Sequence, residues 1–149
     1  MKLGTLIIVV GLPGAGKSTK LQEIRSSLTG LSIEDFHGNA FGDSPAVKDS
    51  RHYRALLEAL HAGHSCAIAD IEFCDPVRRD RLHQAIVAEL PELQIEWIYF
   101  ENAPKKCESN IRLRNRQRVD KDLQALADLA DRYVIPDGVS PIPIWQSST

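Results

Sequence analysis

The sequence predicts an α/β domain in which a mostly parallel sheet is covered by helices on both faces. Short apolar runs alternate with segments of helical periodicity along the chain, and this alternation favours right-handed crossovers between parallel strands. The chain has 149 residues, enough for one domain with a full core and too few for two. Residues 1–149 are therefore predicted to form a single domain.

The composition is that of an ordinary globular protein, with 43% hydrophobic and 26% charged residues. The net charge of −2 provides no global basic field, so a nucleic-acid partner is not expected. No apolar run approaches the roughly 18 residues of a membrane span. The three cysteines lack C-x-x-C spacing, so they indicate neither a disulfide framework nor a zinc site, and a cytoplasmic location is expected.

The first predicted strand, residues 6–10, is followed at once by a phosphate-binding pattern. Residues 11–19 read Gly-Leu-Pro-Gly-Ala-Gly-Lys-Ser-Thr and fit G-x-x-x-x-G-K-[ST], the P-loop. The glycines let backbone N–H groups point at phosphate oxygens, Lys17 supplies a positive charge for the β- and γ-phosphates, and Ser18 can bind Mg²⁺ through its hydroxyl. The predicted nucleotide-binding residues are Gly11, Gly14, Ala15, Gly16, Lys17, Ser18 and Thr19.

A helix is predicted after the P-loop, because Leu21, Ile24 and Leu28 recur at helical spacing. Gly30 is expected to close it in a left-handed conformation. Residues 31–34 then read as a short strand.

Asp35 is expected at the carboxyl end of this second strand. The following residues, 37–43, contain two glycines and show no periodicity, so they are predicted to form a loop. A loop of this length in a compact domain more often belongs to function than to connection, and Phe41 within it is a candidate substrate contact.

Two further helices and a strand follow. Ser44 and Pro45 predict the start of a helix that ends at Gly63, and the apolar run 65–70 predicts a buried strand that stops on Asp70. An aspartate in that place typically contacts Mg²⁺ in P-loop proteins, and the alternative is an aspartate that only caps a turn.

The next helix is predicted from Asp75 to about residue 90, where Pro91 stops it. Its first turn carries Arg78 and Arg79, whose positive charges interact unfavourably with the positive end of the helix dipole. A phosphate or carboxylate nearby would explain them, so both are candidate substrate contacts, with a surface role as the alternative.

The last third of the chain is predicted to contain a strand at 95–100, a helix starting near 102–104, an amphipathic helix over 120–133 and a short edge strand in the proline-rich tail. Between the helices, residues 112–118 carry four arginines at every second position. The alternatives here are a phosphate-clamping segment or a solvated helix in which Glu108 pairs with Arg112.

Ligands of parallel sheets bind beyond the carboxyl ends of the strands. This rule brings together the P-loop, Asp35, the loop through Phe41, Asp70 and the arginine-rich segment. Parts of the chain that are distant in sequence are thus predicted to share one site.

On these motifs the sequence resembles the small P-loop kinases, the group that includes adenylate, shikimate, gluconate and polynucleotide kinases, and within it the single-domain AAA-like or zeta-toxin-like proteins. The resemblance covers nearly the whole chain. It implies a three-layer α/β/α P-loop NTPase fold, a five-stranded sheet in the order 2-3-1-4-5 and a short arginine-rich lid. It also implies that Asp35 occupies the position of the acceptor-hydroxyl base and that Arg112 or Arg116 reaches the nucleotide or the transferred phosphate.

The sequence therefore predicts ATP- and Mg²⁺-dependent phosphoryl transfer to a hydroxyl of an unidentified small-molecule acceptor, with Lys17, Asp35, Arg112 and Arg116 as catalytic residues and Ser18 and Asp70 at the metal. The alternatives are an ATP-binding switch without an acceptor and a nucleic-acid end kinase. The segment 36–44 is too short for a separate nucleoside monophosphate domain, so adenylate-kinase-like chemistry is not expected.

Overall fold

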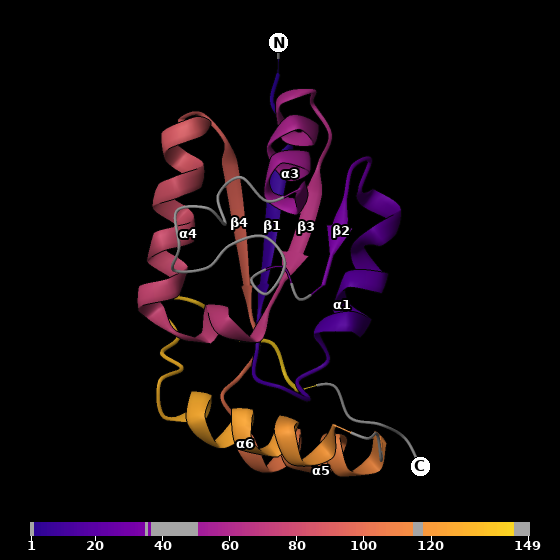
Figure 1. The fold of residues 1–149 in the computed structure, drawn as a ribbon, viewed down its shortest axis with the longest axis vertical. Helices are drawn as coiled ribbons and strands as arrows, with labels where there is room; N and C mark the ends of the chain where they lie inside the picture. The colour runs from indigo at the N-terminus through magenta and orange to yellow at the C-terminus, as the bar shows by residue number, and fades with distance from the viewer. Residues whose placement is uncertain (1, 35, 37–50, 115–117, 145–149) are drawn as a thin grey trace.

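The computed structural model describes residues 2–34, 36, 51–114 and 118–144. Within these ranges, the strands β1 (Thr5–Val10), β2 (Ser32–Ile33), β3 (Cys66–Ala69) and β4 (Gln94–Tyr99) form one sheet in the order β2-β3-β1-β4. Every pairing in this sheet is parallel. Helices flank the sheet, as the alternating pattern predicted (Figure 1).

The observed strand order agrees with the first four positions of the predicted order 2-3-1-4-5, but the fifth strand is not formed as predicted. In the described residues it is reduced to a single parallel bridge between Phe100 and Ile142. Ile142 N–H donates to the Tyr99 carbonyl at 2.8 Å and Glu101 N–H donates to the Ile142 carbonyl at 2.8 Å. Because Pro141 and Pro143 flank Ile142 and lack an N–H, the pairing does not extend further.

The helices begin and end close to their predicted positions. They are α1 (Lys17–Ile24), α3 (Arg51–His61), α4 (Pro76–Glu89), α5 (Pro104–Arg114) and α6 (Val119–Ala130). The Asp75 side chain accepts a hydrogen bond from Val77 N–H at 2.9 Å and so caps α4, as its sequence indicated. The predicted start of the second helix at Ser44 and Pro45 lies outside the described residues.

Gly30 is correctly predicted to follow the first helix, but the predicted reason is wrong. Helix α1 ends at Ile24 and continues as the 3-10 turn Arg25–Ser27, and Gly30 is not among the glycines with positive φ. A Cβ at Gly30 would lie 2.5 Å from Cys66 Sγ. The glycine is needed because its backbone lies directly against residues 64–66, where Gly30 N–H donates to the Ser65 carbonyl at 2.9 Å, and no room remains for a Cβ.

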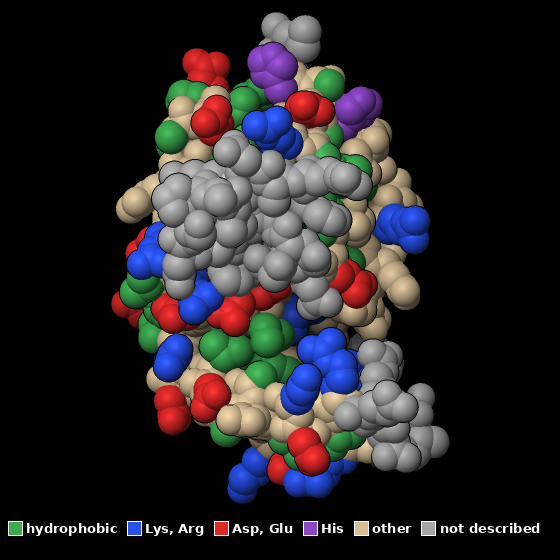
Figure 2. Space-filling model, in the orientation of Figure 1, with side chains coloured by type: hydrophobic (Ala, Val, Ile, Leu, Met, Phe, Trp, Pro, Cys, Tyr) green, Lys and Arg blue, Asp and Glu red, His purple; other side chains and the backbone are tan. Residues whose placement is uncertain are grey.

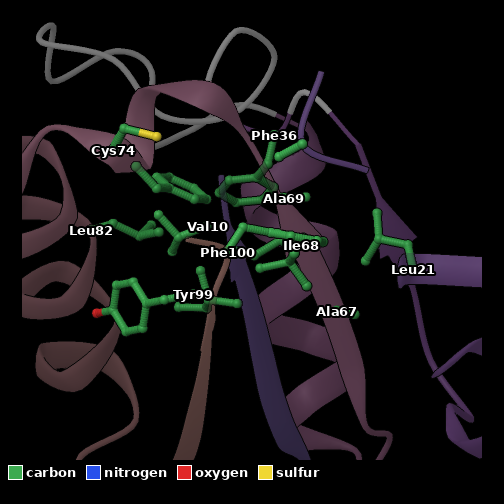
Figure 3. Packing of buried hydrophobic residues seen from close by; sticks show 14 of the residues in the cluster. Val10, Leu21, Phe36, Ala67, Ile68, Ala69, Cys74, Leu82, Tyr99 and Phe100 are labelled. Atoms are coloured by element: carbon green, nitrogen blue, oxygen red, sulfur yellow. The ribbon is translucent and has the colours of Figure 1, made fainter. Parts of the chain in front are cut away.

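The core lies on both faces of the sheet, and β1 is its centre. Leu6, Ile8, Val9 and Val10 are fully buried. Figure 3 shows side chains from α1 (Leu21), from α4 (Leu82) and from the strands pointing into this core. Of the helices in the described part of the chain, none combines the length and apolar character that a membrane span requires.

The carboxyl ends of β1, β3 and β4 point toward one end of the molecule, where α5 and α6 lie (Figure 1). The P-loop leaves β1 at this end and Asp70 follows β3 there. This arrangement positions the candidate site.

Candidate phosphate-binding site

The P-loop connects β1 to α1 and adopts a conformation that requires glycine at two positions. Gly14 has φ 84° and Gly16 has φ 107°, both in the left-handed region. Gly16 is the N-cap of α1 and has no side chain with which to cap that helix. The backbone N–H groups of the first turn of α1 therefore face the loop, an arrangement that suits an anion.

Lys17 is the first residue of α1 and turns back over the loop, where its Nζ donates a hydrogen bond to the Leu12 carbonyl at 2.9 Å. Burial lowers the pKa of Lys17 from 10.5, while electrostatic interactions with Cys74 and Asp70 oppose this shift. A phosphate beside this ammonium group would favour its charged form, because an opposite charge counteracts desolvation.

Two neighbours of Lys17 in the first turn of α1 carry hydroxyl groups. Ser18 is exposed and Thr19 is partly buried. A hydroxyl oxygen is a ligand that Mg²⁺ accepts, so the chemistry of Ser18 fits the predicted metal contact.

Asp70 follows β3 and is 4% exposed. One carboxylate oxygen, Oδ1, accepts a hydrogen bond from Glu72 N–H at 2.7 Å and thereby caps the 3-10 turn Ile71–Cys74. The capping alternative considered for this residue is therefore realised. Its carboxylate also acts electrostatically on Lys17, so capping does not remove it from the site.

Helix α5 packs directly on the P-loop, a contact that the sequence did not predict. The buried side chain of Asn110 donates from Nδ2 to the Gly14 carbonyl at 2.9 Å. A Cβ at Gly14 would lie 2.5 Å from the Cys107 carbonyl oxygen and 2.9 Å from Ile111 Cγ1. The helical spacing of Cys107, Asn110 and Ile111 is the signal that could have indicated one buried face.

The two described arginines near the end of α5 lie on different sides of the helix. Arg112 is exposed and pairs with Glu108 at 3.2 Å, which is the solvated alternative. Arg114 comes four residues after Asn110, so it continues the side that faces the P-loop. Its charge also acts on Lys17 and lowers the pKa of that residue further. Arg116 lies outside the described residues.

The two arginines in the first turn of α4 also differ. Arg78 is partly exposed and pairs with Glu72 at 3.0 Å. Arg79 is buried and donates to the Phe73 carbonyl at 3.2 Å and to the Val134 carbonyl at 2.8 Å. We correct the predicted substrate contact for Arg79, because these backbone carbonyls, and not a ligand, explain its position.

Asp35 and Phe41, two further candidates, lie outside the described residues. Phe36 is described and fully buried, and its ring centroid is 6.5 Å from that of Phe73. Phe73 belongs to the turn that Asp70 caps. The residue after Asp35 is thus packed against the segment that follows β3.

A separate hollow of about 440 Å³ lies between α1 and the segment that carries β2. Its described lining includes Gln22 from α1, Arg25 from the 3-10 turn that follows, and Ser32 and Glu34 in and after β2, and it includes none of residues 11–19. Nothing in its lining connects it to Lys17, so it is not part of the phosphate-binding site.

Residues 6–136 match the family model described as an AAA domain. The chain belongs to the AAA domain family. This AAA domain is 27% identical over 129 residues to the uncharacterized protein R277 of Acanthamoeba polyphaga mimivirus, a match that covers 86% of this chain and 82% of that protein.

Two solved structures are similar to this AAA domain. A gluconokinase from Sinorhizobium meliloti 1021 matches with a TM-score of 0.59 and 16% identity, over 99% of this chain and 86% of that one. A chain of the Pnkp1/Rnl/Hen1 RNA repair complex matches with a TM-score of 0.54 and 20% identity. The match covers 100% of this AAA domain, which spans only about half, 51%, of that chain. These matches confirm the predicted resemblance to small P-loop kinases at the level of the fold.

Proposed function

We propose that this AAA domain transfers the γ-phosphoryl group of ATP to a hydroxyl group of a small-molecule acceptor, with Mg²⁺ as the metal. The observation that carries this proposal is the setting of Lys17. Its ammonium group lies over the P-loop, within electrostatic range of Asp70 and of Arg114. Phosphoryl transfer uses a lysine, a carboxylate and an arginine arranged around a glycine-rich loop, and Lys17, Asp70 and Arg114 are residues of these kinds.

In this proposal Lys17 leaves the Leu12 carbonyl and binds the β- and γ-phosphates together with the loop amides. The hydroxyl of Ser18 and the carboxylate of Asp70 would hold Mg²⁺, directly or through water, since both offer the hard oxygen ligands that this ion prefers. When bound, Mg²⁺ neutralises charge on the phosphate oxygens.

Asp35 is proposed to orient or deprotonate the acceptor hydroxyl, with Phe41 and Arg78 as acceptor contacts. The packing of Phe36 on Phe73 supports this placement, because it joins the end of the second strand to the turn after Asp70. A carboxylate that accepts the acceptor's proton must come within hydrogen-bond reach of it.

Among the described arginines, Arg114 is proposed to neutralise charge on the transferring group. It takes the place of the predicted Arg112, which is exposed and pairs with Glu108. Arg116 stays a candidate for the same task. A guanidinium that approaches the phosphates in the transition state accelerates transfer by electrostatic stabilisation.

The test is a screen of hydroxyl-bearing metabolites, nucleosides and oligonucleotides with a free 5′-hydroxyl for acceptor-stimulated ADP release. Lys17→Ala is the blank. With the stimulating acceptor, Arg114→Ala should lower kcat at least about 100-fold and Arg112→Ala less than about threefold. Equal losses in the two arginine variants would contradict the role given to Arg114. Failure of every acceptor to stimulate release above the blank would favour an ATP-binding switch.

A nucleic-acid end kinase is a second candidate, favoured by one observation. Lys and Arg side chains lie on the end of the molecule that α5 and α6 form, interspersed with acidic side chains (Figure 2). Exposed lysines and arginines occur in α5, in α6 and at the described residue just before α6. They include Lys105, Lys106, Arg112, Arg114, Arg118 and Lys121. Stimulation by the oligonucleotide alone, with affinity that falls steeply with salt, would select this function over a small-molecule kinase.

A further inference from the structure

The side chain of Asn110 connects α5 to the P-loop, and the proposed catalytic steps do not use it. Its Nδ2 donates to the Gly14 carbonyl at 2.9 Å, although the two residues are 96 positions apart in sequence. Asn110 is 4% exposed, so the donor end of this hydrogen bond is shielded from water. A shielded hydrogen bond is stronger than an exposed one, and losing one partner leaves the other unsatisfied.

The peptide group between Gly14 and Ala15 is held at both of its polar atoms. Asn110 donates to its carbonyl, and its N–H donates to the Leu12 carbonyl at 3.0 Å. The same Leu12 carbonyl accepts a hydrogen bond from Lys17 Nζ at 2.9 Å. A chain of hydrogen bonds therefore runs from Asn110 through this peptide group to the lysine of the P-loop.

A glycine-rich loop needs such support because its own sequence does not fix its shape. Gly14 and Gly16 have φ of 84° and 107°, and glycine visits positive and negative φ with similar ease. Rotation of the peptide group between Gly14 and Ala15 would turn loop amides away from a bound phosphate. A side chain that fixes this peptide group before binding lowers the conformational entropy of the free loop. The ligand then binds at a smaller entropic cost.

We propose that Asn110 is a positioning residue that holds the P-loop in its phosphate-receiving conformation and so raises the affinity for nucleoside diphosphates and triphosphates. Asn110 acts through the Gly14 carbonyl and does not touch the nucleotide. The inference rests on the proposed function only in taking the P-loop as the nucleotide site.

The test is a calorimetric titration of the full-length chain with ADP and Mg²⁺. Asn110→Ala deletes the donor, and Asn110→Gln keeps an amide donor on a longer side chain. The matched control is Asn102→Ala. Asn102 lies just before α5, and its Nδ2 donates to the Ala130 carbonyl at 3.1 Å and to the Tyr133 carbonyl at 3.3 Å, away from the P-loop.

Asn110→Ala should raise the Kd for ADP about tenfold, the effect of losing one shielded hydrogen bond, and Asn110→Gln should recover part of that loss. Asn102→Ala should lower the melting temperature while leaving the Kd for ADP within about twofold of wild type. If Asn110→Ala is too unstable to titrate, Asn110→Ser replaces it with the same expectation, because its side chain is polar but too short to donate to the Gly14 carbonyl.

A wild-type Kd in the Asn110 variant, or an equal rise in Asn102→Ala, would overturn the inference. The first result would show that the hydrogen bond to Gly14 does not affect ADP binding. The second would show that a general loss of stability is enough to weaken ADP binding. The titration requires no acceptor, so it stays decisive if the acceptor screen fails. Unchanged ADP binding by Lys17→Ala would instead contradict the proposed nucleotide site.

Discussion

At the scale of single residues, Arg79 is a charged side chain that belongs to the core. Its guanidinium carbon lies 5.2 Å from the centroid of the Tyr99 ring, and it donates to the backbone carbonyls of Phe73 and Val134. Arginine suits this position, because its planar group donates in several directions and stacks on an aromatic face. Arg79 thus connects α4, the turn after Asp70 and the segment after α6.

Replacing Arg79 with leucine is expected to destabilise the protein without removing a ligand contact. The variant leaves two backbone carbonyls without their charged donor, which should lower the free energy of unfolding by about 3 kcal/mol. Arg112→Ala, which breaks only the exposed pair with Glu108, should cost less than about 1 kcal/mol. Urea denaturation of both variants measures the difference, and equal costs would contradict a structural role for Arg79.

At the scale of elements, the contact between α5 and the P-loop sets the geometry of the site. The surface of α5 that includes Cys107, Asn110 and Ile111 lies against Gly14, and Arg114 continues the same side one turn later. A helix presents residues three and four apart on one side. The position of Arg114 relative to the loop is therefore fixed by the packing of the residues before it.

Gly14→Ala tests this packing, and Gly138→Ala is its matched control. Both glycines have positive φ, of 84° and 82°, so each variant should lose about 1 to 2 kcal/mol from backbone strain. An added Cβ at Gly138 would meet nothing within 4 Å, whereas at Gly14 it would lie 2.5 Å from the Cys107 carbonyl oxygen. Gly14→Ala should therefore cost about 1 to 3 kcal/mol more. Equal loss of unfolding free energy in the two variants would show that α5 shifts to accommodate the added Cβ at little energetic cost.

At the scale of the whole molecule, three buried thiols join distant parts of the chain in one core. Cys66, Cys74 and Cys107 are all fully buried and free. Burial raises the pKa of Cys74 to about 12 and that of Cys107 to about 11, from 9.0. The positive charge of Lys17 opposes both shifts without cancelling them.

These pKa values predict that the protein loses stability in alkali. Unfolding returns Cys74 and Cys107 to a pKa near 9.0, so above that pH the unfolded chain binds fewer protons than the folded one. The stabilising contribution is complete below pH 9.0 and is lost as pH rises toward about 11 and 12. Each thiol should contribute a slope of at most about 1.4 kcal/mol per pH unit.

Urea denaturation at a series of pH values measures this slope. The variant with Cys74→Ala and Cys107→Ala should show a shallower fall than wild type over the same range, because it lacks two of the groups whose pKa burial raises. Residual slope is expected from Tyr53, whose pKa burial raises to about 12. An identical slope in wild type and in the double variant would contradict the assignment to the thiols.

Much of the fold follows from local sequence. The P-loop motif, the apolar strands and the cap at Asp75 depend on residues close together in the chain, and the structure places the described elements near their predicted positions. The alternation of strand and helix also determines a parallel sheet, because a crossover of this length returns the chain in the same direction.

Tertiary structure decided the features that depend on contacts between distant segments. Arginines at every second position cannot all lie on one side of a helix, but only the packing of α5 on Gly14 indicates that Arg114 lies on the side of the P-loop. Likewise Gly30, Arg79 and Asn110 owe their roles to partners 36 to 96 residues away, namely Cys66, Val134 and Gly14. A local pattern fixes which residues share a surface, whereas the partner of that surface is set by how the whole chain packs.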